Sequence, residues 1–264
     1  MYKYSNVDLF NYLFNTTFND EDVWWIDEVL NNPGQLRILI EEKGYGGNIV
    51  WSFVSKYQTL SEDFIREFKN EVDWWSISKY QKLSESFIGE FKDKVNWVRI
   101  SQYQKLSEDF IREFKDKVDW INISVYQKLS EDFIREFKNY VWWQGISRYQ
   151  NLSEEFIREF SDRVWWEGIS RYQNLSGGFI REFKDKVDWK YISEYQELSE
   201  DFIREMKNYV NWDNISAYQK LSSKFIRKHK NKLNWSALRM NTNLDAEETE
   251  NLLRRFERIR SIFG

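Results

Sequence analysis

A chain of 264 residues can bury a substantial core, and its 14 Trp and 19% aromatic content exclude an intrinsically disordered protein. It has no cysteine, which excludes disulfides and thiolate metal sites and is typical of a reducing cytosol. The net charge is −4, which argues against nonspecific nucleic-acid binding. Since no apolar run approaches the roughly 20 residues that span a bilayer, we expect a soluble, cytoplasmic protein with no membrane partner.

The first 50 residues precede all repeated sequence and are expected to form a helical cap domain. They hold three basic and eight acidic side chains, a net charge of −5. Breaks at residues 32–34 and 44–47 separate three helix-like stretches, which are Val7–Phe14, Asp20–Leu30 and Gln35–Lys43. We expect this domain, with Trp24 and Trp25, to seal the first repeat.

Tryptophan recurs every 23 residues from residue 51 onward. The repeated positions are Trp51, Trp74, Trp97, Trp120, Trp143, Trp166, Trp189, Trp212 and Trp235. They define eight copies over residues 51–234, followed by a partial copy at the start of the C-terminal segment, residues 235–264. A fixed period of this size is typical of stacked units, none of which can bury its apolar face alone.

Each copy is expected to begin with a short helix. In the second copy Asp73 is placed to cap the helix, and Trp74, Ile77 and Tyr80 form an apolar series at helical spacing. Such a helix has only about eight residues, so it needs its neighbours to be stable.

A second helix follows in each copy. Ser84 is placed as its cap, and Phe87, Ile88, Phe91 and Val95 form one apolar stripe. This stripe predicts a helix of about 12 residues, or roughly 18 Å. Two helices with short connections make an αα unit, so the predicted fold class is an all-α solenoid of αα repeats.

Residues that stay the same in every copy are assigned to the scaffold. Ser78, Gln81 and their equivalents are expected to satisfy backbone groups between neighbouring repeats. Glu62 and Arg66, four residues apart, recur in further copies as helix-surface pairs. These repeated carboxylates indicate a solvated face rather than an acid/base site, because an active site would occur once.

Residues that vary between copies are the candidates for partner binding. They lie one residue before the repeated Trp and one, two, five and eight residues after it. Three of these positions are three residues apart, on one side of the first helix. A scaffold that varies one helical face presents a binding surface there, although exposed residues also drift without function.

Two adjacent copies depart most from the pattern. Trp142 and Trp165 replace the capping Asp or Asn, and Gly145 and Gly168 follow inside the helices. A lost cap and a helical glycine each cost about 1 kcal/mol, and such uncompensated costs mark candidate functional sites. The predicted partner-binding residues are Trp142, Arg148, Trp165, Arg171, Tyr140 and Trp75. The alternative is that each Trp ring lies over its own glycine and only fills space.

Basic side chains gather in the eighth copy. They are Lys220, Lys224, Arg227, Lys228, Lys230 and Lys232. This patch is a candidate site for an anionic partner, or else it is the polar end of the stack. Residues 235–264 are expected to add a capping helix with Leu252, Leu253, Phe256, Ile259 and Phe263 on its apolar face.

The inventory of reactive side chains is poor. The only histidine, His229, occupies a position that holds Phe or Met in the other copies. One His without Cys cannot build a zinc site, a nucleophilic triad or a Cys–His pair. We therefore expect no enzymatic activity, no bound metal and no cofactor.

The repeated strings Leu-Ser-Glu-Asp-Phe-Ile-Arg-Glu-Phe and Trp-x-x-Ile-Ser-x-Tyr-Gln resemble Trp-rich 23-residue repeats of bacteriophage and giant-virus proteins. The resemblance implies a viral or prophage origin and a host protein as partner, for example a CRISPR-type defence effector. Two alternatives stay open. One is nucleic-acid or nucleotide binding through the basic patch, and the other is a structural or assembly scaffold.

Overall fold

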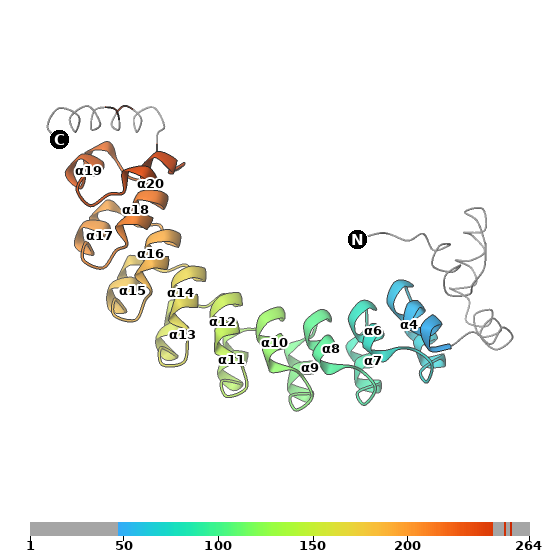
Figure 1. The fold of residues 1–264 in the computed structure, drawn as a ribbon. Coiled ribbons are helices and arrows are strands. Elements are labelled where there is room, and N and C mark those ends of the chain that lie inside the picture. The colour runs from blue at the N-terminus through green and yellow to red at the C-terminus, as the bar shows by residue number, and fades with distance from the viewer. Residues whose placement is uncertain (1–46, 245–250, 252–253, 255–264) are drawn as a thin grey trace, which may run out of the picture. The chain divides into compact units, whose positions relative to one another are not determined.

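The computed structural model describes residues 47–244 together with residues 251 and 254. This part of the chain contains 17 helices and no strand, and the helices recur with the 23-residue period (Figure 1). The all-α repeat architecture predicted from the sequence is therefore confirmed. Nearly all of the predicted N-terminal cap and of the predicted final helix lies outside the described residues. None of the described helices has the length and apolar character that crossing a membrane requires.

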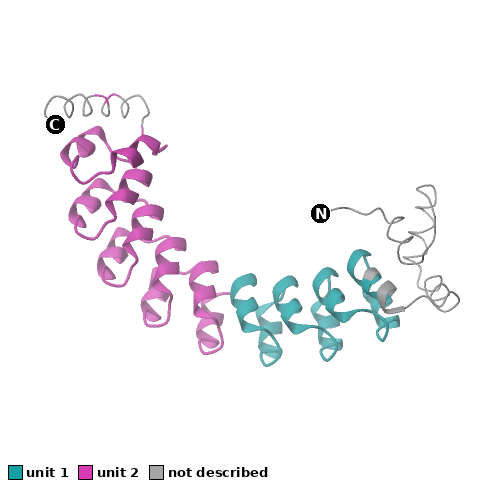
Figure 2. Ribbon diagram, in the orientation of Figure 1, with its two compact units in different colours: residues 1–127 teal, residues 128–264 magenta. Residues whose placement is uncertain are grey.

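The chain divides into two compact units, residues 1–127 and 128–264 (Figure 2). The described part of unit 1 contains α4 (Gly47–Tyr57), α5 (Glu62–Glu67), α6 (Trp74–Tyr80), α7 (Glu85–Glu90), α8 (Trp97–Tyr103), α9 (Glu108–Glu113) and α10 (Trp120–Tyr126). The described part of unit 2 contains α11 (Glu131–Glu136), α12 (Trp143–Tyr149), α13 (Glu154–Glu159), α14 (Trp166–Tyr172), α15 (Gly177–Glu182), α16 (Trp189–Tyr195), α17 (Glu200–Glu205), α18 (Trp212–Tyr218), α19 (Ser223–Lys228) and α20 (Trp235–Met240). Within each unit the even-numbered helices form one row and the odd-numbered helices a second row (Figure 1).

The even-numbered helices are the predicted first helices of the repeats, and each packs on the next one within its unit. In α6 the Asp73 carboxylate accepts a hydrogen bond from the Trp75 amide, which confirms the predicted cap. Ile77 is completely buried, as are its equivalents along both units. These helices have seven residues from α6 to α18, close to the predicted length.

The odd-numbered helices are shorter than predicted. Ser84 caps α7 through the Phe87 amide, as expected, but the helix has six residues rather than about 12. It ends at Glu90, because the next residue, Phe91, has a φ of −105° and a ψ of 30°, which are not helical. A turn closed by a hydrogen bond from the Val95 amide to the Phe91 carbonyl then returns Val95 to the core. The predicted apolar stripe and its capped helix are confirmed, but the predicted length was wrong, because only the first half of the stripe is helical.

Aromatic rings join the two helices of each repeat. The Trp74 ring lies 5.0 Å from Phe91 and 6.2 Å from Phe87, and the two Phe rings are 4.7 Å apart. The Trp74 indole N–H donates a 2.9 Å hydrogen bond to the Lys69 carbonyl of the preceding turn. A large ring whose one polar group is satisfied contributes apolar burial at little cost, which explains why Trp recurs here.

A serine and a glutamine connect neighbouring repeats. The Gln104 amide donates to the carbonyls of Ser78 and Gln81, at 3.0 and 2.8 Å, and its oxygen accepts from the Leu83 amide. The Ser78 hydroxyl accepts from the Asn96 amide at 2.9 Å. Both side chains are buried. The predicted role of these residues in satisfying backbone groups between layers is confirmed.

Candidate binding surface

One tyrosine per repeat, at the end of each first helix, is exposed to solvent. These residues are Tyr57, Tyr80, Tyr103, Tyr126, Tyr149, Tyr172, Tyr195 and Tyr218, and we call them the tyrosine row. Their exposed fractions range from 38% for Tyr172 to 59% for Tyr57. The sequence pattern had placed Tyr80 in the apolar series of the scaffold, and this assignment was wrong. The ring is not part of the core.

In unit 2 arginine side chains lie between the rings of the tyrosine row. The Arg148 guanidinium is 4.9 Å from the ring centres of both Tyr149 and Tyr172. Arg171 lies 5.1 Å from Tyr172 and 5.0 Å from Tyr195. These distances are typical of cation–π contacts. Two of the predicted binding residues, Arg148 and Arg171, therefore join three tyrosines into one continuous surface.

Arg171 is held mainly by these rings. It also lies 5.3 Å from the Tyr191 ring, and its Nε atom is buried with no hydrogen-bond partner in the part of the chain that the structure describes. Burial acts to lower the pKa of Arg171, but the neighbouring Tyr172 and Tyr195 more than offset it, so the pKa is raised. The guanidinium is therefore a permanent positive charge among tyrosine rings.

Unit 1 has a similar arrangement with lysines. Lys79 lies 4.7 Å from the Tyr80 ring and 5.2 Å from the Tyr103 ring. Trp75, a predicted binding residue, is 40% exposed and is contacted by Lys79 at 5.2 Å and by Arg99 at 4.9 Å. Trp75 thus extends the tyrosine row of unit 1 sideways onto the first turn of α6.

One of the two unusual tryptophans packs over its own glycine. Neither Trp142 nor Trp165 makes a side-chain capping bond. A Cβ atom added at Gly168 would lie 2.5 Å from Cε3 of Trp165, so this ring does lie over its own glycine, as the alternative interpretation expected. Trp142 is 39% exposed, and Gly145 is buried.

Tyr140 does not lie on a first helix. It is 48% exposed in the turn that follows α11, and its ring contacts Phe137 edge-on at 5.9 Å. The predicted binding residues therefore come from three kinds of position: the cap before a first helix, the helix itself, and a turn after a second helix. Trp75 belongs to unit 1 and the other five belong to unit 2.

The predicted basic patch is divided by the fold. Lys224, Arg227 and Lys228 are exposed at spacings of three and four residues, which places them on one face of α19. Lys230 and Lys232 lie in the following turn, where the Lys232 amine is 5.0 Å from the Trp212 ring.

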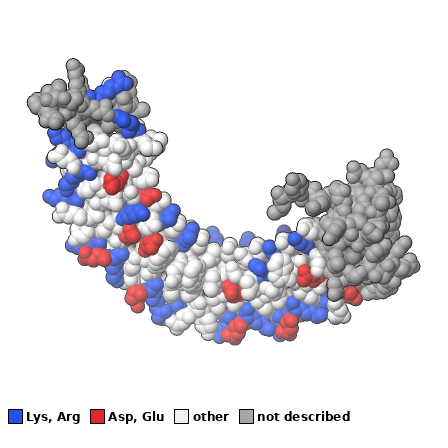
Figure 3. Space-filling model, in the orientation of Figure 1, with Lys and Arg blue, Asp and Glu red and all other residues white. Residues whose placement is uncertain are grey.

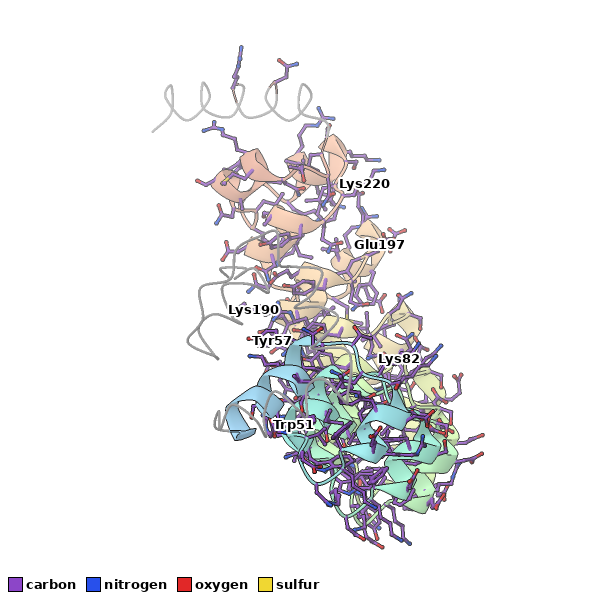
Figure 4. The ribbon with its side chains drawn as sticks, turned by 90° about the vertical axis from the view of Figure 1, so that its right-hand side faces the viewer. Trp51, Tyr57, Lys82, Lys190, Glu197 and Lys220 are labelled. Carbon is purple, nitrogen blue, oxygen red and sulfur yellow. The ribbon has the colours of Figure 1, made fainter. Side chains whose placement is uncertain are left out.

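Lys220 lies elsewhere in unit 2. It lines a cleft of about 740 Å³ together with Tyr195, Glu197, Tyr218 and Asn243. Lys220 and Glu197 project from the same side of this unit in Figure 4. A hydrogen bond with Glu194 and, to a lesser extent, burial raise the pKa of Tyr195. The cleft is lined by charges of both signs and includes two members of the tyrosine row, Tyr195 and Tyr218.

The second helices carry salt bridges of mixed sign rather than one charged patch. Figure 3 shows basic and acidic side chains next to one another along the edge of unit 2 that the odd-numbered helices form. The Arg158 Nε lies 2.8 Å from a carboxylate oxygen of Glu182 in the next repeat. This hydrogen bond raises the pKa of Arg158 by more than burial lowers it. Among the described residues, no group of three or more His, Cys, Asp or Glu is arranged to hold a metal ion.

The fold and the surface define an α-helical repeat protein with an exposed aromatic row. No family model, curated protein or solved structure matches the chain. The tyrosine row was missed at the sequence level. Tyrosine is retained at this position in all eight copies, but so is the leucine at the buried position of Leu83, so retention alone does not mark an exposed residue.

Proposed function

We propose that the chain is a non-enzymatic binding protein that holds another protein against the first helices of unit 2, through the tyrosines of the row in that unit and the residues beside them. The single observation that carries this proposal is the exposure of one tyrosine in each repeat, between 38% and 59%. Tyrosine, tryptophan and arginine supply most of the binding energy in protein interfaces, and a contiguous exposed aromatic surface is uncommon without a partner.

The neighbours of the row fit this role. Arg148, Arg171, Trp142 and Trp165 lie on the same helices or at their caps, so they add cationic and aromatic groups to the surface. Arginine stacked between tyrosines is already oriented, which lowers the entropy lost when a partner binds. A viral origin and a host defence effector as the partner stay predictions from the family resemblance.

A matched pair of tyrosines tests the proposal. Tyr172 in the row and Tyr209 in the turn after α17 are 38% and 39% exposed, so Tyr172→Ser and Tyr209→Ser remove equal exposed rings from different faces. We expect a protein that the wild-type chain captures from a host lysate to be bound at least about tenfold more weakly by Tyr172→Ser and equally well by Tyr209→Ser. Quantitative capture with purified chains measures this. Equal capture by all three would contradict the proposal, and capture of the chain by itself alone would favour a scaffold.

A second candidate function is binding of an anionic partner, such as a nucleic acid, to the exposed face of α19. It is favoured by a reversal of charge, because Lys228 stands where the preceding repeats have a glutamate. In the seventh repeat this glutamate, Glu205, pairs with Arg181 of the sixth. We expect Lys224→Glu with Lys228→Glu to abolish binding of single-stranded DNA at low salt, measured by fluorescence anisotropy. No binding by the wild-type chain at low salt would exclude this function.

A further inference from the structure

In several second helices, one arginine side chain forms a hydrogen bond to a carboxylate of the next repeat. The Nε atoms of Arg66, Arg135, Arg158 and Arg181 lie 2.8, 2.8, 2.8 and 2.9 Å from a carboxylate of the following repeat. The same guanidinium groups lie 5.0 to 5.1 Å from the centre of a buried Phe ring of that repeat. A third contact, about one turn back, goes to a glutamate of the same helix, as for Arg66 and Glu62 at 3.6 Å.

The second repeat lacks this arginine and has Gly89 in its place. The groups that the guanidinium would contact are still present: Glu85 on the same helix, and Phe110 and Glu113 in the next repeat. They line a notch of about 410 Å³ together with Ser86, Ser107, Asp109 and Phe114, which we call the Gly89 notch. Phe110 is 6% exposed, whereas Phe87 is completely buried beneath Arg66.

Two of the carboxylates that line the notch already have partners. Both oxygens of Glu85 accept hydrogen bonds from Ser107, and Asp109 pairs with Arg112 at 2.8 Å. Glu113 is different, because it has no ion pair or side-chain hydrogen bond within the described part of the chain. It is the equivalent of Glu90, which accepts the 2.8 Å bond from Arg66. Glu113, the carboxylate that would accept the hydrogen bond of an arginine at position 89, is therefore open to a ligand.

Packing does not require a glycine at this position. A Cβ atom at Gly89 would approach Phe114 no closer than 3.6 Å, which is an ordinary contact, and no positive φ makes glycine necessary. Glycine inside a helix costs about 1 kcal/mol relative to alanine. The absent side chain thus removes stability without relieving a clash.

We propose that the Gly89 notch binds the guanidinium group of an arginine side chain on another protein. Arg66 in the preceding repeat shows the arrangement expected: one face over the phenyl ring and an N–H directed to the open glutamate. A guanidinium suits this notch better than an ammonium, because it is planar, stacks on a ring and offers donors in a fixed fork. The site lies on α7 and α9, away from the tyrosine row, so it holds or fails independently of the proposed function.

An NMR titration of the full chain with N-acetyl-arginine methylamide tests the proposal. We expect saturable shifts of the Gly89 amide signal with a Kd on the order of 1–10 mM, as suits a single side chain. The uncharged analogue N-acetyl-citrulline methylamide should bind at least about tenfold more weakly, because it cannot form the ion pair. Unsaturable shifts, or equal shifts with both compounds, would overturn the proposal.

Two variants sharpen the experiment. Gly89→Arg fills the notch with the chain's own guanidinium and should abolish the saturable response to the arginine amide at Phe110 and Glu113, while Gly89→Ala should retain it. The reciprocal variant Arg135→Gly opens an equivalent notch, with Glu131, Phe156 and Glu159 as its lining, and should create a second site at position 135. Persistence of the Phe110 response in Gly89→Arg, or no second site in a folded Arg135→Gly chain, would count against the proposal.

Discussion

A buried glutamine that follows a first helix satisfies three backbone groups that would otherwise lack partners. Gln173 donates to the carbonyls of Ser147 and Gln150 and accepts from the amide of Leu152, at distances of 2.8 to 3.0 Å. A buried donor or acceptor that loses its partner costs about 1–3 kcal/mol. This glutamine is buried between adjacent repeats and connects them.

We therefore expect Gln173→Ala to lower the free energy of unfolding by about 2–4 kcal/mol, since it orphans three backbone groups. Asn174→Ala, one residue further along and exposed, is the matched control and should change it by less than about 0.5 kcal/mol. Urea unfolding followed by circular dichroism measures both. Similar losses in the two variants would show that the glutamine is not the connecting group.

Trp165 and Gly168 should be energetically coupled, because the indole occupies the space that a Cβ at residue 168 would need. Gly168→Ala alone is expected to destabilise the chain by about 1–2 kcal/mol through overpacking. In a Trp165→Asp background the same change should stabilise it by up to about 1 kcal/mol, as alanine normally does in a helix. A double-mutant cycle from urea unfolding checks this, and additive effects would contradict it.

The candidate residues could be found from the sequence where they break the repeat, as Trp142, Trp165 and their arginines do. The tyrosine row could not, because a residue kept in every copy looks the same whether it is buried or exposed. Side-chain contacts between repeats, such as Arg148 with Tyr172, join residues 24 positions apart in sequence. One sequence shows which residue types recur but not which of them meet across a repeat boundary.

At the scale of single elements, the first helices could be predicted and the second helices only in part. A stripe of Phe87, Phe91 and Val95 at intervals of four fits a continuous helix. It fits equally well a six-residue helix followed by a turn with the same hydrogen-bond spacing, from the Val95 amide to the Phe91 carbonyl. Hydrophobic periodicity records which side chains reach the core and does not distinguish these two backbones.

The second helix of the eighth repeat, α19, should make the stability of the folded chain depend on pH. His229 directly follows this helix, and its ring lies 4.3 Å from Phe225 and 5.6 Å from Trp212. Burial, and after it the positive charges of Lys228, Arg204 and Lys232, lower the pKa of this histidine below its usual value. The folded chain thus binds the proton less well than the unfolded chain does.

It follows that the contribution of neutral His229 is fully present above pH 6.5, the usual pKa, and is lost as the pH falls from there through the lowered pKa of the folded state. We expect His229→Phe, which restores the residue found in most other copies, to stabilise the chain more at pH 5.5 than at pH 8. Thermal unfolding of both chains at the two pH values measures the difference. An equal gain at both would mean that protonation of the ring plays no part.

At the scale of each unit, contacts are made between a repeat and its immediate neighbours, so damage should stay local. In Gln173→Ala, hydrogen exchange should accelerate for amides of the adjoining repeats, such as Ile157 and Ile169. Amides of Ile77 and Ile88 in unit 1 should exchange as in the wild-type chain. Hydrogen–deuterium exchange with mass spectrometry tests this, and uniform acceleration along the chain would point to a single cooperative unit instead.

The glutamine connections have a direction, because each repeat is completed by the one that follows it. Asn241 performs this task for the eighth repeat by donating to the carbonyls of Ser216 and Gln219, at 2.9 and 3.0 Å. On the ribosome, each repeat must therefore wait for the next 23 residues before its backbone is satisfied. At about 5–20 residues per second this delay is roughly 1–5 s, so the nascent chain should assemble one repeat behind its own synthesis.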